Sequence, residues 1–153
     1  MFNRSVLQPL QMADIFTPQK RSWVMSRIRS KNTSIDIMMK RLLSDAGTGF
    51  VMYPKMDGNP DFAIPSRKVA IFCDGDFWHG YNYTHGKRLR KGYWTDKIEG
   101  NMRRDRRVSR RLRYHGWSVL RFWEHDLKKR PEMCARKVRK TLKKNKKREF
   151  RIP

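Results

Sequence analysis

Cysteine, acidic side chains and long apolar runs are all scarce in this chain of 153 residues. Its two cysteines, Cys73 and Cys134, form no CxxC pair, which argues against a disulfide framework and against a cysteine-rich zinc site. No segment approaches the roughly 18 consecutive apolar residues of a membrane-spanning helix, and the first residues contain no apolar core of a signal peptide. We therefore expect an intracellular, cytoplasmic protein with no membrane partner.

The scarcity of acidic residues leaves a net charge of +23, because 37 Lys and Arg face only 14 Asp and Glu. A charge of this size destabilises a compact state by self-repulsion, which indicates a polyanionic partner. Aromatic residues make up 12% of the chain, and their rings can stack on bases. No long basic helix has the broad apolar face that an anionic membrane would favour. The composition therefore predicts a nucleic-acid partner.

The length of the chain predicts one folded domain with a core of its own. Residues 1–16 show no firm periodicity and are expected to be flexible. Residues 143–153 are rich in Lys and Arg, which is typical of an electrostatic arm. We therefore assign the folded domain to residues 17–142, with extensions at both ends.

Apolar spacing, capping residues and turn residues define the elements that we expect within this domain. They predict helices over 18–30, 34–46, 94–114 and 131–142, and strands over 49–54, 62–64, 69–73 and 117–123. A strand, a long helix and a further strand indicate a crossover connection, so the fold class is α/β with a mixed sheet flanked by helices. The basic, irregular stretch 80–92 is expected to be a binding loop.

The stretch 60–79 contains the clearest functional pattern. Asp61 enters the first strand of a predicted hairpin and Asp74 leaves the second, so both carboxylates reach the same edge of a buried sheet. Buried carboxylates repel each other unless a cation compensates them, and their oxygens suit Mg²⁺. His79 follows closely enough to act as a general base beside such a metal. The alternative is that both aspartates only cap strand ends at the surface.

The helix predicted over 94–114 carries two polar residues on its apolar face. Asn101 and Asp105 share the spacing of Ile98, Val108 and Leu112, and therefore point inward. Inward polar groups need partners, and the nearest candidates are the metal edge and His79. The outer faces carry a single sign of charge, from Arg103, Arg104, Arg106, Arg107, Arg110, Arg111 and Arg113. Such a surface favours a phosphate backbone.

Several short motifs, in order along the chain, carry a resemblance to a known family. They are Met12-Ala13-Asp14, Arg21-Ser22, Pro60-Asp61-Phe62, Phe77-Trp78-His79, Asn101, Arg104-Asp105-Arg106-Arg107, Gly116-Trp117 and Trp123-Glu124. Over about residues 12–126 the chain resembles the very-short-patch-repair (Vsr) DNA mismatch endonucleases. The resemblance implies the restriction-endonuclease-like PD-(D/E)xK fold, and a Mg²⁺-dependent nick in one strand of double-stranded DNA at a T:G mismatch. A DNA substrate would place the protein at the nucleoid.

The resemblance also implies roles for individual residues. The candidate catalytic residues are Asp36, Asp61, Asp74, His79 and Asp105, of which Asp74 follows from the hairpin rather than from the resemblance. Among them, Asp61 would ligate the metal together with the backbone carbonyl of Cys73, and Asp105 would orient a histidine. We expect DNA contacts from Phe77, Trp78, Trp94, Arg21, Lys97, Asn101, Arg104 and Arg107. The three aromatic residues would wedge into the base stack beside the mismatch, and ordinary core packing is the alternative for them.

The sequence departs from the family's pattern in two places. Asp74 stands where the best-known members have a histidine, and we take it as a second ligand for Mg²⁺. The family's zinc ligands are replaced by Asp76, Tyr81, Tyr83 and His125, and tyrosines are poor ligands for a tetrahedral zinc site. We therefore expect the structural zinc to be absent, and the stretch 80–92 to be held by packing or by DNA.

The sequence thus predicts a metal-dependent DNA endonuclease that nicks one strand at or near a T:G mismatch. Two alternatives stay open. One is a nuclease of the same fold with another DNA target, either a restriction-type site or branched DNA. The other is a basic DNA-binding protein without catalytic activity, although such a protein has no need of inward-pointing acids.

Overall fold

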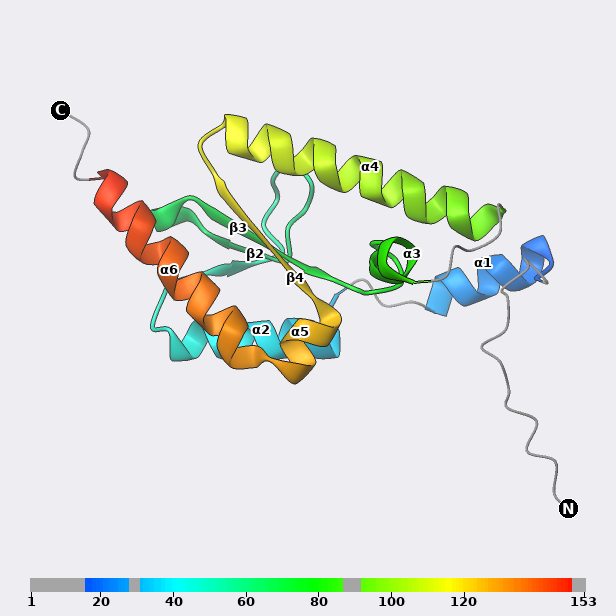
Figure 1. Ribbon diagram of the computed structural model, residues 1–153, viewed down its shortest axis with the longest axis horizontal. Helices are drawn as coiled ribbons and strands as arrows, with labels where there is room; N and C mark the ends of the chain where they lie inside the picture. The colour runs from blue at the N-terminus through cyan, green and yellow to red at the C-terminus, as the bar shows by residue number, and fades with distance from the viewer. Residues whose placement is uncertain (1–15, 28–30, 87–91, 150–153) are drawn as a thin grey trace, which may run out of the picture.

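The structure, a computed structural model, describes residues 16–27, 31–86 and 92–149. Its centre is a four-stranded sheet in the order β1-β2-β3-β4 (Figure 1). The strands are β1 (Val51–Met52), β2 (Phe62–Ile64), β3 (Val69–Asp74) and β4 (Ser118–Trp123). The β1–β2 and β2–β3 pairs are antiparallel, whereas β3 and β4 are parallel. The predicted mixed sheet is therefore confirmed.

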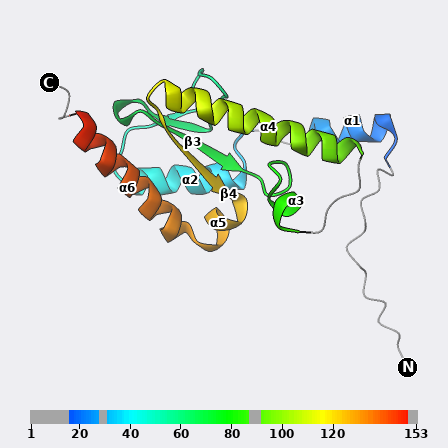
Figure 2. The same ribbon diagram turned by 45° about the horizontal axis from the view of Figure 1, so that its top comes forward.

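Helices cover both faces of this sheet (Figure 1). One face is covered by α2 (Ser34–Asp45), α5 (Glu124–Lys129) and α6 (Pro131–Glu149), and the other by α4 (Tyr93–Tyr114). The remaining helices, α1 (Pro18–Arg27) and α3 (Tyr81–His85), lie beyond the end of the sheet beside the first turns of α4 (Figure 2). This arrangement is the helix-flanked sheet that the sequence predicts.

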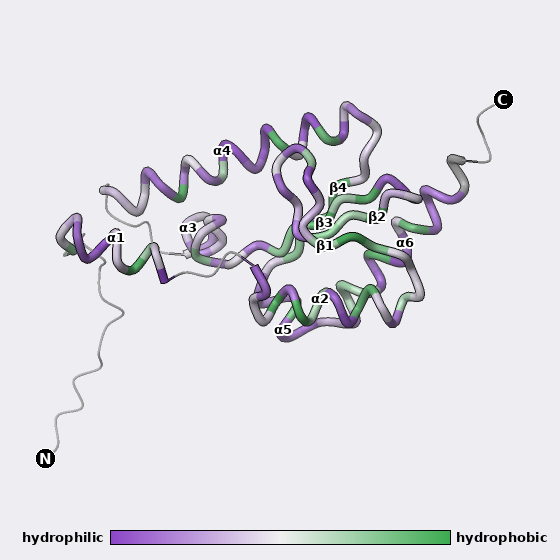
Figure 3. Tube along the Cα trace, turned by 180° about the vertical axis from the view of Figure 1, so that it is seen from behind, coloured by the Kyte–Doolittle hydropathy of each residue, from purple (hydrophilic) through white to green (hydrophobic). Residues whose placement is uncertain are grey.

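The central strand β3 is buried on both faces because its side chains alternate between two apolar clusters. Val69 and Ile71 belong to the larger cluster under α2, α5 and α6, whereas Ala70 and Phe72 pack with Val108 of α4. Figure 3 shows apolar residues concentrated in the strands, while most of α4 is hydrophilic. Apolar side chains of β3 fill both faces of the sheet up to the end of the strand. Polar groups from the two helix layers therefore meet at its last residues.

The secondary structure differs from the sequence-based expectation in several details. The strand predicted over 49–54 is reduced to β1, Val51–Met52. A short helix, α3, forms within the stretch predicted to be an irregular loop, and α5 follows β4 where no helix was expected. The predicted end of the last helix at residue 142 is wrong, because α6 continues to Glu149. The buried Asn145 explains the continuation, since it donates to the backbone oxygen of Arg67 at 2.7 Å and bonds the hydroxyl of Ser118.

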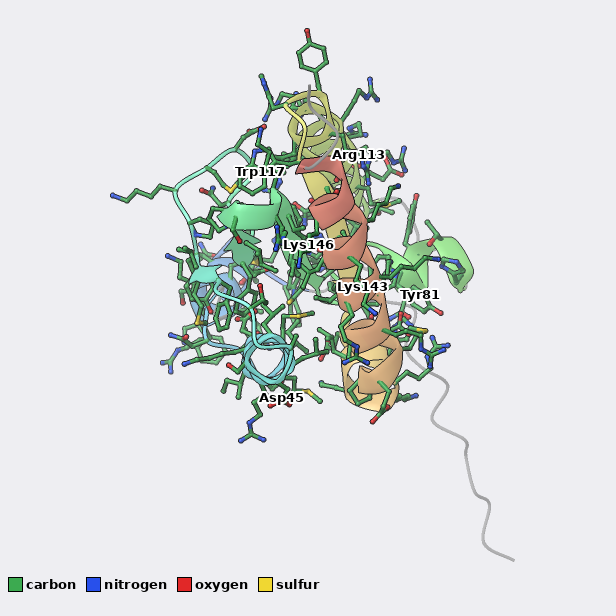
Figure 4. All side chains as sticks on the ribbon, turned by 90° about the vertical axis from the view of Figure 1, so that its left-hand side faces the viewer. Asp45, Tyr81, Arg113, Trp117, Lys143 and Lys146 are labelled. Carbon is green, nitrogen blue, oxygen red and sulfur yellow. The ribbon has the colours of Figure 1, made fainter. Side chains whose placement is uncertain are left out.

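The region 143–149 is therefore not the unfolded arm that its composition suggests. Figure 4 shows Lys143 and Lys146 on α6, with Arg113 near the end of α4. No helix within the described ranges is both long enough and apolar enough to cross a membrane.

Candidate active site

A cavity of about 310 Å³ lies at the end of β3, where β2, β3, β4 and α4 meet. Its lining contains most of the acids singled out in the sequence, together with two arginines. The lining residues are Gly58, Asn59, Asp61, Phe72, Cys73, Asp74, His79, Arg104, Asp105, Val108 and Arg121. The expectation that the hairpin brings Asp61 and Asp74 to one edge of the sheet is confirmed. Asp74 is only 4% exposed, which rules out the alternative of a surface cap for that residue.

Asp61 stands immediately before β2, and its side chain turns toward the end of β3. Its Oδ2 accepts a hydrogen bond of 2.7 Å from the backbone nitrogen of Cys73. Burial raises the pKa of Asp61 to about 6, and the negative charges of Asp36 and Asp74 push it in the same direction. The protein therefore provides too little positive charge to stabilise the ionised form of Asp61, and a bound cation would supply that charge.

Asp36 reaches the same region from the first turn of α2. It forms a capping box with Thr33, whose backbone nitrogen and hydroxyl both donate to Asp36 Oδ2 at 2.9 Å. The hydroxyl of Tyr53 donates to the same oxygen at 3.1 Å. Three donors thus hold Oδ2, and Oδ1 accepts no hydrogen bond from the described residues. Asp36 is only 2% exposed, so it is a buried carboxylate as well as a cap.

The donor set formed by Asp36, Asp61 and Cys73 fits an oxygen-binding metal through its carboxylates. One potential ligand atom from each side chain lies within 4.8 Å of the others. Two carboxylates are the usual protein ligands of Mg²⁺, whereas a thiol is not. Burial, with the nearby negative charge of Asp61, holds the pKa of the Cys73 thiol far above its ordinary range. The thiol is thus protonated, so a contribution from Cys73 would have to come from its backbone carbonyl, as the family resemblance implies.

His79 faces the cavity with one ring nitrogen already engaged. Its Nδ1 lies 2.6 Å from Oδ2 of Asp105 and 3.5 Å from Oδ1 of Asp74. Burial acts to raise the pKa of Asp105, but the hydrogen bond from His79 and the charge of Arg121 hold it below its usual range. An ionised Asp105 favours the tautomer of His79 that carries its proton on Nδ1, which leaves Nε2 as the ring atom able to accept a proton. The predicted inward position of Asp105 beside His79 is confirmed.

Arg121, on β4, is a functional residue that the sequence reasoning missed. Its Nε and Nη2 each donate to Asp74 at 2.7 Å, and Nη2 lies 3.2 Å from Oδ1 of Asp105. Its guanidinium carbon stands 4.5 Å from the centre of the Phe72 ring. The sequence does contain a signal for Arg121. It is a cation between the apolar residues Leu120 and Phe122 of a strand, and a cation in such a position requires an anionic partner.

The contacts of Arg121 bear directly on the predicted metal-binding role of Asp74. Both carboxylate oxygens of Asp74 are occupied by this arginine. A metal at Asp74 would have to share both oxygens with the positive charge of a bidentate arginine, whereas Asp36 and Asp61 have no arginine or lysine partner within the described ranges. The geometry therefore favours the pair Asp36 and Asp61 as metal ligands, and the role of Asp74 as a ligand stays a prediction.

The aromatic residues predicted to contact DNA form one cluster between the end of β3 and the start of α4. Trp78 lies 4.9 Å from Phe77 and 5.7 Å from Trp94, measured between ring centres. Trp94 is only 6% exposed, while Phe77 and Trp78 are half-buried. Asn101 donates to the backbone oxygen of Trp78 at 2.9 Å and so fixes the segment that carries His79. Core packing thus accounts for Trp94, and the other two rings keep partly open faces.

The predicted basic DNA contacts are spread over three places. Arg104 lines the catalytic cavity. Arg21 and Lys97 line a separate cleft between α1 and the start of α4, where the guanidinium of Arg21 lies 4.8 Å from the ring centre of Tyr93. Arg107 is exposed on the outer side of α4. These residues therefore surround the acidic cavity rather than forming part of its centre.

The four residues at the family's zinc positions make contacts of their own. Asp76 Oδ1 lies 2.8 Å from Nδ1 of His125, and the ring centres of Tyr81 and His125 are 4.3 Å apart. The hydroxyl of Tyr83 donates to Glu99 at 2.5 Å. These contacts attach the described part of the stretch 80–92 to β4, α4 and α5. The absence of zinc stays a prediction. Residues 87–91, which include the predicted basic part of this loop, lie outside the described residues.

Comparison with known proteins agrees with this geometry. The family described as DNA mismatch endonuclease Vsr matches residues 13–85. The type II nicking enzyme V.NmeDIP of Neisseria meningitidis serogroup C is 39% identical over 84% of this chain and 90% of its own length. The DNA mismatch endonuclease Vsr of Escherichia coli K12 is 35% identical over 80% of each chain.

A solved structure supports the predicted fold independently of these sequences. The catalytic domain of the homing endonuclease I-Bth0305I superposes with a TM-score of 0.54, over 74% of this chain and 98% of that domain. Only 17% of the residues are identical, so the likeness concerns the fold alone. The expectation of a restriction-endonuclease-like fold is thus confirmed.

Proposed function

Since the chain belongs to the Vsr DNA mismatch endonuclease family and is a DNA-nicking endonuclease, we propose that it cuts one strand at or near a T:G mismatch with the help of Mg²⁺. The observation that supports the chemistry most strongly is the joint placement of Asp61 and His79 in one cavity. The first is a carboxylate whose raised pKa calls for a cation, and the second is a histidine with a free Nε2.

Asp61 and Asp36 are the residues that would hold the metal. When bound, Mg²⁺ would supply a Lewis acid that stabilises the negative charge growing on the scissile phosphate in the transition state. The three donors on Asp36 Oδ2 orient this carboxylate before any ligand arrives. The hydrogen bond from the Cys73 nitrogen does the same for Asp61. The protein thus presents both carboxylates without a reorganisation cost at the moment of reaction.

His79 would act as the general base. Its Nε2 takes a proton from the attacking water while a new bond forms between the water oxygen and phosphorus, and the bond from phosphorus to the leaving oxygen breaks. The leaving oxygen then takes a proton from solvent. Asp105 stabilises the imidazolium that forms, because its Oδ2 lies 2.6 Å from Nδ1. Arg104 lines the cavity, where it can contact the phosphate.

The half-buried rings of Phe77 and Trp78 support the mismatch specificity. Inserting a ring between base pairs costs unstacking energy, and a mispaired step lowers that cost. These two residues directly precede His79, so a ring inserted beside the mismatch would bring the strand to the cavity. Trp94 would pack against the rings of Phe77 and Trp78 rather than insert between base pairs.

The test is a labelled duplex with one T:G mismatch, incubated with the protein and Mg²⁺ beside its fully matched twin. We expect a nick in one strand of the mismatched duplex only, and no nick from Asp61→Asn. If neither duplex is nicked at any Mg²⁺ concentration while the protein binds both, the proposal fails.

A second candidate is favoured by the relatives described as type II nicking enzymes. In this case the chain would nick duplex DNA at a target other than a T:G mismatch. The same experiment separates the two, because equal nicking of the matched twin would favour the second candidate and still require Asp61.

A further inference from the structure

A second cleft, of about 510 Å³, lies beside the catalytic cavity and is not used by the chemistry above. It is lined by Lys31, Tyr53, Pro54, Lys55, Asn59 and Pro60. Asn59 lines both spaces, and Pro60 directly precedes Asp61. The backbone nitrogen of Tyr53 donates to the backbone oxygen of Asp61 at 2.8 Å, which places the two residues opposite each other across the β1–β2 edge. The cleft is therefore one strand spacing from a proposed metal ligand.

The two spaces carry opposite charges. The cleft has two lysines and no acid in its lining, whereas the catalytic cavity contains Asp61, Asp74 and Asp105. Lys31 and Lys55 are both exposed, and neither makes an ion pair with a carboxylate in the described part of the chain. The ammonium of Lys31 lies 5.2 Å from the centre of the Tyr53 ring. The cleft therefore offers two positive charges that the protein itself does not neutralise.

The wall of the cleft is built from backbone in an unusual conformation. Tyr53 and Asn59 have φ angles of 48° and 49°, and Asn32 beside them has a φ of 52°. Asparagine tolerates such angles, but a bulky residue such as Tyr53 rarely adopts them, and the cases that persist gather at ligand sites held by surrounding contacts. Here the contacts are those of the Tyr53 hydroxyl, which accepts from the nitrogen of Asn32 at 2.6 Å and donates to Asp36. The cleft and the proposed metal ligand Asp36 thus share one rigid connection.

We propose that this cleft binds a backbone phosphate next to the scissile one on the strand being cut, with Lys31 and Lys55 as its ligands. The proposal rests on the proposed function, because it takes the scissile phosphate to lie at Asp61. A strand entering the cavity passes the shared residue Asn59, so its neighbouring phosphodiester reaches the lysines. Contacts of this kind set the register of the strand without reading sequence. The cleft would therefore determine which linkage meets the catalytic residues.

The first measurement is metal-free DNA binding over a range of salt concentrations. We compare the wild-type protein with Lys31→Gln/Lys55→Gln and with a control, Lys140→Gln/Lys144→Gln, which removes two exposed charges from α6. Loss of the one phosphate that both lysines bind should reduce the slope of log K against log salt by about 0.9, the contribution of one neutralised phosphate. Circular dichroism confirms that each variant is folded. An unchanged slope in Lys31→Gln/Lys55→Gln would overturn the proposal.

The second measurement locates the contact on the DNA. Single phosphates around the mismatch are replaced, one at a time, by a neutral methylphosphonate. One linkage should weaken the binding of wild type and of the α6 control by roughly tenfold, because a charge-assisted contact is lost. The same linkage should leave Lys31→Gln/Lys55→Gln unaffected. Two outcomes would show that the proposal is wrong. In one, every neutral linkage lowers the DNA affinity of Lys31→Gln/Lys55→Gln by the same factor as that of the wild type. In the other, no neutral linkage lowers the affinity of the wild type.

These binding measurements do not depend on cleavage, so the two proposals can fail separately. A wild-type protein that binds with the expected coupling but nicks no duplex would contradict the proposed function and leave the phosphate site standing. A wild-type protein that nicks the mismatched duplex, but shows no linkage whose effect depends on the two lysines, would support the proposed function and contradict the phosphate site.

Discussion

Arg121 and Asp74 form a bidentate ion pair at the end of the parallel β3–β4 pair, with both hydrogen bonds 2.7 Å long. The same arginine contacts Asp105, which in turn holds His79. One cation therefore balances two of the acids in the cavity and, through Asp105, positions His79, the proposed general base. The acids that it does not reach, Asp36 and Asp61, are the proposed metal ligands. This division of charge explains how one small cavity contains so many carboxylates.

Replacement of Arg121 should be costly for stability. Arg121→Gln leaves Asp74 and Asp105 buried without their cation, and we expect the free energy of unfolding to fall by about 3 kcal/mol. Urea denaturation measures the change. Arg110→Gln is the matched control, because Arg110 is exposed on the outer side of α4 and should change stability by less than about 0.5 kcal/mol. Equal losses in the two variants would show that the ion pair contributes little.

Asp61 should destabilise the metal-free protein at neutral pH. Its folded pKa of about 6 exceeds the ordinary value of 3.8, so the folded state binds more protons between these values and stability falls as pH rises through this range. Asp61→Asn removes the buried charge, and we expect it to be more stable than wild type at pH 7 by on the order of 2 kcal/mol. At pH 4 the difference should vanish. Thermal denaturation in the presence of a chelator measures both.

Asp57 gives a control of opposite sign for that experiment. A hydrogen bond from Arg111 holds the pKa of Asp57 below its usual range, so its contribution to stability is present at pH 7 and is lost as pH falls. Asp57→Asn should therefore lower stability at pH 7, where Asp61→Asn raises it. A change in stability of the same sign in both variants at pH 7 would contradict the conclusion that the ionised Asp61 destabilises the folded protein.

His79→Ala should separate catalysis from binding. Loss of a general base lowers the rate by about a hundredfold or more, so single-turnover nicking should slow by that amount while DNA affinity stays within about threefold, since a phosphate-dominated interface keeps its contacts. His115→Ala is the control, because His115 is exposed at the end of α4, away from the cavity. A parallel loss of affinity in His79→Ala would instead indicate that the residue mainly binds DNA.

Much of this site follows from local sequence patterns, and the rest depends on contacts between distant residues. The hairpin placed Asp61 and Asp74, and the helix period placed Asp105 on the inward face of α4. His79 was expected nearby because it follows Asp74 closely in the sequence. Arg121 was missed because its partner lies 47 residues away and no local pattern pairs them. The length of α6 was missed for a similar reason, since Asn145 is held by Ser118 and Arg67 rather than by its own helix.

Residues 76–86, the segment around His79 and α3, should keep their structure in the presence of a zinc chelator. The side chains at the four zinc positions of the family are bound to each other or to neighbours, through Asp76 with His125, Tyr81 with His125, and Tyr83 with Glu99. We therefore expect a strong zinc chelator to leave the thermal midpoint and the hydrogen exchange of residues 76–86 unchanged. Tyr81→Ala should speed exchange in α3 and leave β2 and β3 protected, because Tyr81 packs on His85, Trp123 and His125 at the edge of the fold. A fall in the midpoint with chelator, reversed by added zinc, would show that a metal holds this segment after all.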